Sequence, residues 1–245
     1  MKRSRFACLL FCMATVSLLL SCGGDESKKS TSTDSTAVDS SKAVKQVVNT
    51  IITTPQNMMV VTNKVSNYAK WKTAYDEDDS VRLVNGIHNF VIGRGLQDSN
   101  TVFVAVKVDD MAKAKAFAKN PRLKKVMQKA GVIGAPSFSF TTITFQDTAD
   151  INTPLRSRAT LTVKDWDAWQ KAFEEGKQAR IDNGIVVRAY GHDVDDNKKV
   201  SVVTALIDTA KANAYLNSDV MKKRREASGV IGQPNRFAYR LVQRY

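Results

Sequence analysis

The chain matches itself without a gap when it is shifted by 98 residues. The identical positions combine tryptophan, glycine, proline and charged residues, and they include Val65/Val163, Trp71/Trp169, Arg82/Arg180, Gly93/Gly191, Asp110/Asp208, Pro136/Pro234 and the segments 85–87/183–185 and 131–134/229–232. Self-similarity at a fixed period indicates a duplicated structural unit. The sequence therefore predicts one module, present twice, in a fold that pairs with a copy of itself.

The N-terminal segment is typical of a bacterial lipoprotein signal peptide. Basic residues at positions 2, 3 and 5 precede an apolar run over residues 6–20, which is short for a membrane span. The run ends in Leu-Leu-Ser-Cys at Cys22, which resembles the lipobox of such proteins. By that resemblance residues 1–21 are removed and Cys22 carries the lipid. The alternative is an ordinary secretory signal with a chance cysteine.

Residues 22–56 are rich in Ser, Thr, Asp and Lys and nearly lack aromatic residues. Such a composition cannot bury a core, so we expect a flexible tether between the lipid and a folded domain. Its last part becomes apolar at Val47, Val48, Ile51 and Ile52, where we expect a short helix packed on the domain. The two modules are expected at residues 57–147 and 155–245.

Each module is predicted to have the element order βαββαβ, the split ferredoxin-like arrangement. Helix starts are indicated by Asn67 and Asp110 in the first module and by Asp165 and Ser218 in the second. The elements expected in the first module are a strand at 58–64, a helix at 67–85, strands at 87–95 and 101–108, a helix after 110 that restarts at 121, and a strand at 137–145.

The predicted strands are apolar on both faces. Four valines alternate along residues 101–108, which predicts one buried face beneath the helices, and the valine-rich strands indicate that the second face is buried too. One module would leave the second face exposed. We therefore expect the two modules to press sheet against sheet within one polypeptide, giving a monomer that contains its own pseudo-dimer.

Three motifs recur in both modules: Val-x-x-Tyr/Trp-x-x-Trp, Arg-x-x-Asn-Gly-Ile and Gly-Val-Ile-Gly-x-Pro. With them, residues 58–243 resemble the dimeric α+β barrel superfamily, and within it the antibiotic-biosynthesis-monooxygenase-like proteins. The resemblance implies an α+β fold in which two tandem ferredoxin-like βαββαβ modules form an intramolecular dimeric α+β barrel. It does not fix a function, because this superfamily includes cofactor-independent oxygenases, haem-handling enzymes, cyclases and isomerases.

Cysteine and histidine are scarce. Two of the three cysteines leave with the signal peptide and Cys22 is acylated, so the folded part has no thiol for a disulfide, catalysis or metal binding. His88 and His192 occupy non-equivalent positions of the repeat, which disfavours a histidine-rich metal centre. Residues 208–228 contain no histidine to serve as the ligand that the resemblance implies for haem. We expect no cofactor and no metal.

The chain carries a net charge of +13, and loss of the three basic residues of the signal peptide leaves +10. In a cytoplasmic protein this charge would suggest nucleic acid. The expected lipid anchor makes anionic lipid head groups the nearer partner, so we expect no nucleic acid. The densest cluster, residues 222–225, is interpreted as the solvated face of a helix. The expected location is the bacterial cell envelope, with the outer membrane, on its periplasmic or surface face, as the first candidate.

Each first helix is predicted to carry aromatic residues and an arginine on one stripe. These are Tyr68, Trp71, Tyr75 and Arg82, and Trp166, Trp169, Phe173 and Arg180. An unpaired buried charge is costly, so each arginine needs a partner, either a ligand anion or a protein acid such as Glu77. Structural pairing is the first interpretation. We predict a ligand pocket between this helix and the sheet, with His88 and His192 as further candidates whose simpler role is structural.

Three classes of function remain open. The leading one is a lipid-anchored envelope protein that binds a small aromatic or anionic ligand without catalysis. The second is a cofactor-independent monooxygenase or isomerase acting on a small aromatic or quinone-like compound. The third is a structural envelope protein that interacts with another protein or with lipid. The sequence does not decide whether the protein is an enzyme.

Overall fold

The computed structural model describes residues 49–245. The expected signal peptide, Cys22, Val47 and Val48 lie outside the described residues. Within the described range, no helix is both long and apolar enough to cross a membrane.

Residues 49–245 contain nine strands and eight helices, and the βαββαβ order occurs twice. The first module comprises β2 (Gln56–Val65), α1 (Tyr68–Glu77), α2 (Asp79–Val84), β3 (Ile87–Gly95), β4 (Thr101–Val108), α3 (Met111–Ala118), α4 (Pro121–Lys129) and β5 (Val132–Asp147). The second comprises β6 (Leu155–Val163), α5 (Trp166–Glu175), α6 (Lys177–Asp182), β7 (Ile185–Asp193), β8 (Lys199–Leu206), α7 (Thr209–Leu216), α8 (Asp219–Ala227) and β9 (Val230–Arg244). This order confirms the two ferredoxin-like modules.

Capping side chains begin the helices where the sequence predicted. The Oδ1 atom of Asn67 accepts the backbone N–H of Lys70 at 2.9 Å, and Oδ1 of Asp165 accepts that of Ala168 at 2.8 Å. Such caps satisfy amides at a helix start that have no intrahelical partner. The single helix expected in each module over 67–85 and its equivalent is instead two short helices, because each is interrupted at residue 78 or 176.

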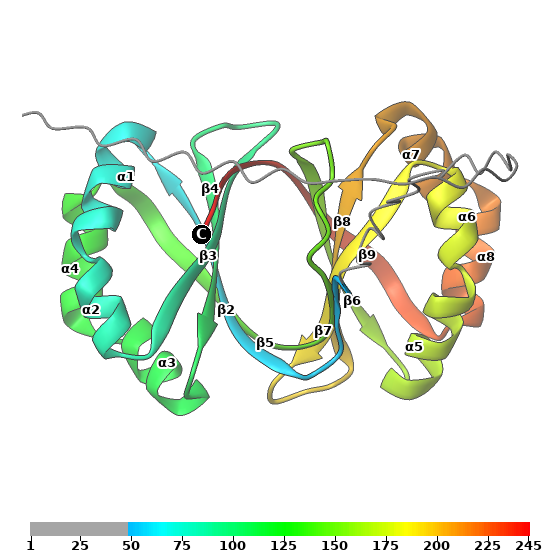
Figure 1. The fold of residues 1–245 in the computed structure, drawn as a ribbon, viewed down its shortest axis with the longest axis horizontal. Helices are drawn as coiled ribbons and strands as arrows, with labels where there is room; N and C mark the ends of the chain where they lie inside the picture. The colour runs from blue at the N-terminus through cyan, green and yellow to red at the C-terminus, as the bar shows by residue number, and fades with distance from the viewer. Residues whose placement is uncertain (1–48) are drawn as a thin grey trace, which may run out of the picture. The chain divides into compact units, whose positions relative to one another are not determined.

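Eight of the strands close into a barrel in the order β5-β2-β4-β3-β9-β6-β8-β7, and β7 pairs back onto β5. The long strands β5 and β9 start in their own module and end against β7 and β3 of the other. Helices α1–α4 cover one flank and α5–α8 the other (Figure 1). The two sheets are thus hydrogen-bonded along both edges, which removes open edges, and are not merely stacked face to face as expected.

Glycines at equivalent repeat positions allow both seams between the modules to close. A Cβ atom at Gly93 of β3 would lie 2.2 Å from the ring of Tyr239 in β9. A Cβ atom at Gly191 of β7 would lie 2.0 Å from the carbonyl oxygen of Thr142 in β5. Real side chains never approach so closely, so the identity of these two residues follows from barrel closure.

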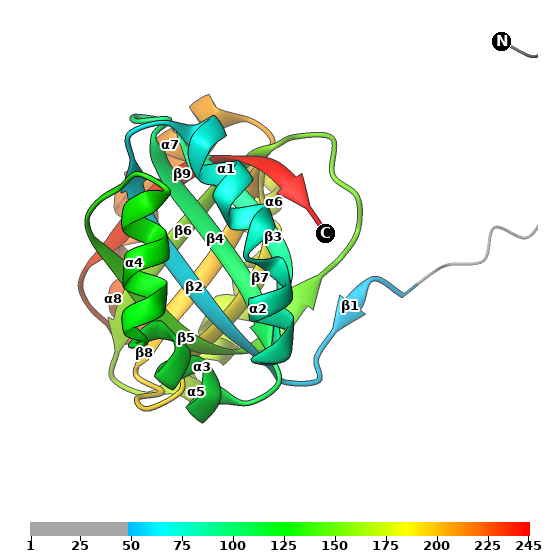
Figure 2. The same cartoon turned by 90° about the vertical axis from the view of Figure 1, so that its left-hand side faces the viewer.

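The barrel strands separate an outer core from an inner one. The four alternating valines of β4 are buried beneath the helices, whereas Phe103 and Ala105 between them pack inside the barrel with Met58 and Val60. Figure 2 shows α1, α2 and α4 lying across β2, β3 and β4. Both faces of the sheet are therefore buried, as the strand pattern predicted.

The apolar segment that precedes the barrel is a strand, and the prediction of a helix there was wrong. β1 (Ile51–Ile52) pairs antiparallel with β5, opposite Asp147 and Gln146. Isoleucine favours extended backbone because its branched Cβ restricts the side chain in a helix. At residues 146–147, β5 has passed the end of β2 and offers a free edge to this segment.

Candidate functional site

The first module has a cavity between its helices and the sheet, at the predicted place. Trp71 of α1, Val104 of β4, Phe117 of α3 and Phe138 of β5 line it. The empty space along its wall, open solvent included, comes to about 610 Å³, and the cavity itself to about 70 Å³. Most of its wall is apolar, and its principal charged groups are Asp78 and Arg82, each of which has a partner in the protein.

Arg82 is neutralised by its own module. Its Nη2 donates to Oδ1 of Asp79 at 3.0 Å, and its Nη1 donates to the carbonyl oxygen of Tyr75 at 2.7 Å. The guanidinium carbon lies 3.7 Å from the centre of the Tyr75 ring. Asn89 also donates to Oδ1 of Asp79, at 2.6 Å. The arginine is thus structurally paired, although its acid is Asp79 and not Glu77.

Asp78 is neutralised in the same way. It is buried, and Nη2 of Arg122 on α4 lies 2.5 Å from its Oδ1. Nearby, burial raises the pKa of the Tyr75 hydroxyl, so that this group stays protonated at neutral pH. The first pocket therefore presents a largely apolar surface whose two charged groups are paired within the protein, although Nε of Arg82 and Nδ2 of Asn63 are buried without a hydrogen-bond partner among the described residues.

The equivalent cavity of the second module has a different wall. Trp169 and Phe173 of α5 and Tyr215 of α7 form its aromatic part. The empty space along its wall, open solvent included, comes to about 790 Å³, and the cavity itself to about 90 Å³. Four arginines also line it, namely Arg180, Arg224, Arg225 and Arg236. Among the described residues, none of those that line it is acidic.

Arg180 lacks the carboxylate partner that Arg82 has. It is 7% exposed, its Nη1 donates to the carbonyl oxygen of Phe173 at 2.6 Å, and its guanidinium stacks 3.8 Å from that ring. Its Nε and Nη2 are buried and have no hydrogen-bond partner within residues 49–245. Burial lowers the pKa of Arg180 and Arg224 lowers it further, whereas Glu174, which forms no salt bridge with it among the described residues, opposes the change.

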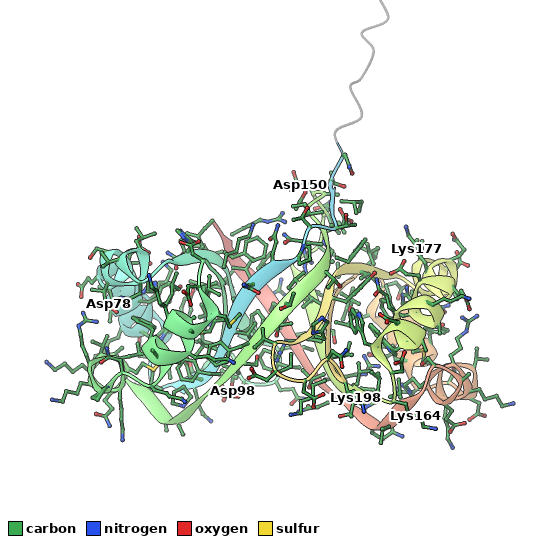
Figure 3. All side chains as sticks on the ribbon, turned by 90° about the horizontal axis from the view of Figure 1, so that it is seen from below. Asp78, Asp98, Asp150, Lys164, Lys177 and Lys198 are labelled. Atoms are coloured by element: carbon green, nitrogen blue, oxygen red, sulfur yellow. The ribbon has the colours of Figure 1, made fainter. Side chains whose placement is uncertain are left out.

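The difference between the two arginines follows from two positions of the repeat. Asp78 and Asp79 of the first module are replaced by Gly176 and Lys177 in the second. Asp78 and Lys177 lie on opposite flanks, each beside the helices of its own module (Figure 3). The second module has therefore lost both acids that neutralise the first pocket.

Gly176 also makes room for the arginines. A Cβ atom at this position would lie 3.0 Å from Nη1 of Arg180 and 3.2 Å from Nη1 of Arg224. Two guanidinium groups thus approach the same point without an acid between them. Arg224 disfavours the charge on Arg180, whereas Glu174 favours it by more, without forming a salt bridge among the described residues.

The remaining aromatic residues of the predicted site lie beside the pockets. Tyr68 packs in a tilted arrangement against Trp71 with 5.8 Å between ring centroids, and Trp166 does the same against Trp169 with 5.3 Å. Neither Tyr68 nor Trp166 lines the cavity of its module. They support the tryptophans that do.

The two histidines lie away from both cavities. Nε2 of His88 is 2.9 Å from Oδ2 of Asp109 at a solvent-exposed position. Nδ1 of His192 is 2.9 Å from the carbonyl oxygen of Asp193, and its ring meets the edge of Trp166 at 4.8 Å between centroids. Neither histidine lines the helix–sheet cavities.

Sequence reasoning missed the other pocket arginines because it compared the identical positions of the two copies. The differing pairs carry the signal, and they are Val126/Arg224, Met127/Arg225 and Phe138/Arg236. Within the basic cluster 222–225, Lys222 and Lys223 are exposed as predicted. Arg225 instead lines the pocket and donates to the carbonyl oxygen of Leu216 at 3.2 Å.

The wall of the second pocket holds cationic donors and aromatic surface. Within residues 49–245, no group of three or more His, Cys, Asp or Glu residues is placed to hold a metal ion. Below the pocket, burial raises the pKa of Tyr190 to about 12, so its hydroxyl is protonated at neutral pH.

Comparison with known proteins places the fold. No protein-family model and no curated protein matches this chain. Among solved structures, a candidate monooxygenase from Fusobacterium nucleatum subsp. nucleatum superposes with a TM-score of 0.52 at 11% identity, covering 77% of this chain and 93% of that one. An anthrone oxidase-like protein gives 0.51 at 12% identity, covering 79% and 94%. A candidate chlorite dismutase gives 0.51 at 15% identity, covering 76% and 95%.

At these identities the likeness shows the fold alone. The closed barrel, the helix layers and the repeated order define a dimeric α+β barrel. The chain has the fold of the ferredoxin-like, monooxygenase-like proteins, with both halves of the barrel in one polypeptide, as its motifs implied.

Proposed function

We propose that this chain is a ligand-binding protein whose second module holds a small flat anion between its helices and the sheet. The observation that carries the proposal is Arg180, a buried guanidinium with two nitrogens that find no partner within residues 49–245, on the wall of a cavity that no acid of this range lines. A carboxylate or enolate would supply the missing acceptor. Trp169 and Phe173 offer a broad apolar surface for an aromatic body.

The first module provides the internal comparison. The same helix–sheet cavity exists there, but the equivalent arginine, Arg82, is already paired with Asp79. An anion entering the first pocket would compete with a bonded carboxylate, whereas one entering the second pocket would meet a guanidinium that has no salt-bridge partner among the described residues. The ligand therefore belongs to the second module.

The substitution Lys177→Asp tests this assignment. It restores the acid that Asp79 provides in the first module, so the new carboxylate is expected to pair with Arg180. Using 1-hydroxy-2-naphthoate as the probe, we expect tryptophan quenching and calorimetry to show binding to the wild type. We expect about a 10- to 100-fold weaker affinity in the variant, the value of a charge-assisted hydrogen bond, without a lower melting temperature.

The control is Lys198→Asp, which makes the same charge change at an exposed lysine away from Lys177 (Figure 3). It should leave the affinity for the probe nearly unchanged. An equal loss in both variants would show a general charge effect and contradict the proposal. Unweakened binding by Lys177→Asp would also contradict it.

The second candidate function is a cofactor-independent monooxygenase or isomerase. The fold shared with a candidate monooxygenase and an anthrone oxidase-like protein favours it. Such chemistry needs a base to take a phenolic proton, and the described wall of the second pocket has neither a histidine nor a carboxylate. We therefore rank binding above turnover. Oxygen uptake that depends on an aromatic substrate and on Arg180 would reverse this ranking.

We further propose that the domain is held at the bacterial cell envelope by a lipid on Cys22. The support is the Leu-Leu-Ser-Cys segment after a short apolar run, in a part of the chain outside the described residues. More than one acyl chain gives durable anchoring. Cys22→Ala should move the protein from the membrane fraction to the soluble fraction. A processed variant that stays with the membrane would contradict the lipid anchor.

A further inference from the structure

A third cavity lies inside the barrel, where strands of the two modules face each other. The empty space along its wall, open solvent included, comes to about 740 Å³, and the cavity itself to about 90 Å³. The sheet separates it from the helix–sheet pockets, since neighbouring strand residues point to opposite faces. Phe103 of β4, for example, lines the inner cavity, whereas Val104 lines the pocket of the first module.

The inner cavity has two unlike walls. Three apolar residues of the first module have arginine as their counterpart in the second, and the pairs are Met58/Arg156, Val60/Arg158 and Phe90/Arg188. All six residues line the cavity. We call the first set the apolar wall and the second set the arginine wall.

Two members of the arginine wall have no acidic partner. Nη1 of Arg188 lies 2.9 Å from Oδ2 of Asp147, which neutralises it. Arg156 and Arg158 form no salt bridge within residues 49–245. Arg156 is buried, and Arg158 is largely so. The cavity thus contains two positive charges that the described protein does not balance.

Hydrogen bonds hold these two arginines in place. Nε of Arg158 donates to Oγ of Ser201 at 3.0 Å, and its Nη2 donates to Oγ of Ser139 at 3.0 Å. Because Ser139 belongs to β5 and Arg158 to β6, this side chain crosses the barrel interior. Nη1 of Arg156 donates to the carbonyl oxygen of Leu155 at 2.9 Å. All of these acceptors are neutral.

A further polar donor lies beside them. Tyr239 of β9 is directly opposite Arg156 in the strand register and is 2% exposed. Burial raises the pKa of its hydroxyl, while Arg156 and Arg158 oppose the rise. The group is therefore a neutral donor at physiological pH. Two guanidinium groups and one hydroxyl meet in the same part of the cavity.

We propose that the barrel interior binds an amphipathic carboxylate. Its head group lies between Arg156 and Arg158, and its apolar part lies against the apolar wall. Two unbalanced buried cations require an anion, because neutral hydrogen bonds do not repay the cost of desolvating a charge. The first module contributes mostly apolar surface to the cavity, with Thr141, Gln146 and Asp147 as its polar residues, so one molecule with a charged end and an apolar body satisfies both walls.

Dodecanoate is a suitable probe, with two controls that each lack one of its features. Dodecanol has the chain without the charge, and inorganic phosphate has charge without the chain. We expect dodecanoate to bind by calorimetry and to raise the melting temperature of the whole protein more than either control. Equal effects from dodecanol would contradict the role of the arginine wall. Equal effects from phosphate would reduce the site to a simple anion site and overturn the proposal.

The double variant Arg156→Met/Arg158→Val copies the first module and tests the location. It should weaken dodecanoate binding by about 100-fold or more, since two charged partners are lost. Arg180→Met, in the helix–sheet pocket, should leave dodecanoate binding unchanged and weaken only 1-hydroxy-2-naphthoate. If Arg180→Met weakened the binding of both probes and the double variant left dodecanoate binding unchanged, both probes would lie in the helix–sheet pocket. That result would contradict this inference and leave the proposed function intact.

A measurement on the wild type decides the location even if the double variant does not fold. Nuclear Overhauser contacts between the dodecanoate chain and the methyl group of Met58 are expected, since Met58 lines only the inner cavity of those described here. Contacts to Met221 of the second pocket instead would overturn the placement.

Discussion

Arg82 and Arg180 occupy equivalent positions, yet their surroundings predict opposite effects on stability. Arg82→Met removes a charge-assisted bond to Asp79 and should lower the free energy of unfolding by about 1–3 kcal/mol. Arg180→Met removes a buried charge without an acidic partner and should be neutral or stabilising, because an apolar side chain of similar length needs no desolvated partner. Urea unfolding of both variants measures the contrast. An equal loss would mean that Arg180 is also structural.

Tyr190 gives a prediction on alkaline stability. Burial raises its pKa to about 12 in the folded protein, compared with about 10 in an unfolded chain. The unfolded state therefore loses this proton first, and the stabilisation is complete below about pH 10 and falls by about 1.4 kcal/mol per pH unit up to about pH 12. Tyr190→Phe should flatten this part of the stability profile. An unchanged slope would contradict the shift.

Single residues were predictable where the two copies agree and not where they differ. Trp71 and Trp169 line their cavities as the helical spacing predicted. Arg156 and Arg158 were missed because each stands where the first module has an apolar strand residue, and no local sequence pattern indicates that an arginine is buried. Only the three-dimensional pairing of β6 with β9 and its approach to β5 brings them together.

At the scale of elements, the seams between the modules depend on glycine. Gly191→Ala would place Cβ 2.0 Å from a backbone oxygen of β5. The backbone of a paired strand cannot move aside as the end of a flexible side chain can. We expect a loss of about 1–3 kcal/mol or more, with faster hydrogen exchange of the amides that join β5 and β7.

Gly134→Ala is the control for this substitution. Its Cβ would meet nothing within 4 Å, and its only cost is a positive φ of 71°, about 1–2 kcal/mol. It should not change exchange at the β5–β7 seam. If Gly191→Ala were equally mild and left the seam protected, the close approach would not be what fixes this glycine.

The ends of helices and strands were predicted correctly where a capping residue or a turn sequence marks them. Strands β3 and β4 span the predicted residues, and Asn67 and Asp110 begin helices. The long strand β5 was predicted too short at both ends: residues 132–136 pair in part with the end of β2 after a register shift, and the last residues extend along β7 and β1. The division of each first helix was also missed, since neither Asp78 nor Gly176 breaks a helix on its own.

At the scale of the whole molecule, the inner cavity predicts that the two halves behave differently when separated. Residues 56–150 alone would expose an apolar inner face that includes Met58, Val60 and Phe103. We expect them to form a homodimer or to aggregate, as light scattering would show. A stable monomer would contradict the pairing of the modules, whereas the complete domain should be monomeric.

Residues 151–245 alone should pair poorly. A symmetric dimer of this half would bring two copies of Arg156, Arg158 and Arg188 into one cavity, and like charges at close range repel strongly. We expect weak or absent association at low salt, strengthened by sulfate. Association as tight as that of the first half, without an added anion, would contradict the electrostatic account.

Covalent linkage frees the two halves from symmetry. In a homodimer every substitution occurs twice, so an arginine wall could arise only by abolishing the apolar wall that faces it. In a single chain one copy can keep the stabilising residues of its ancestor while the other acquires costly polar ones. The fused barrel thus permits a division of labour, in which one half supplies folding stability and the other is free to change what it recognises.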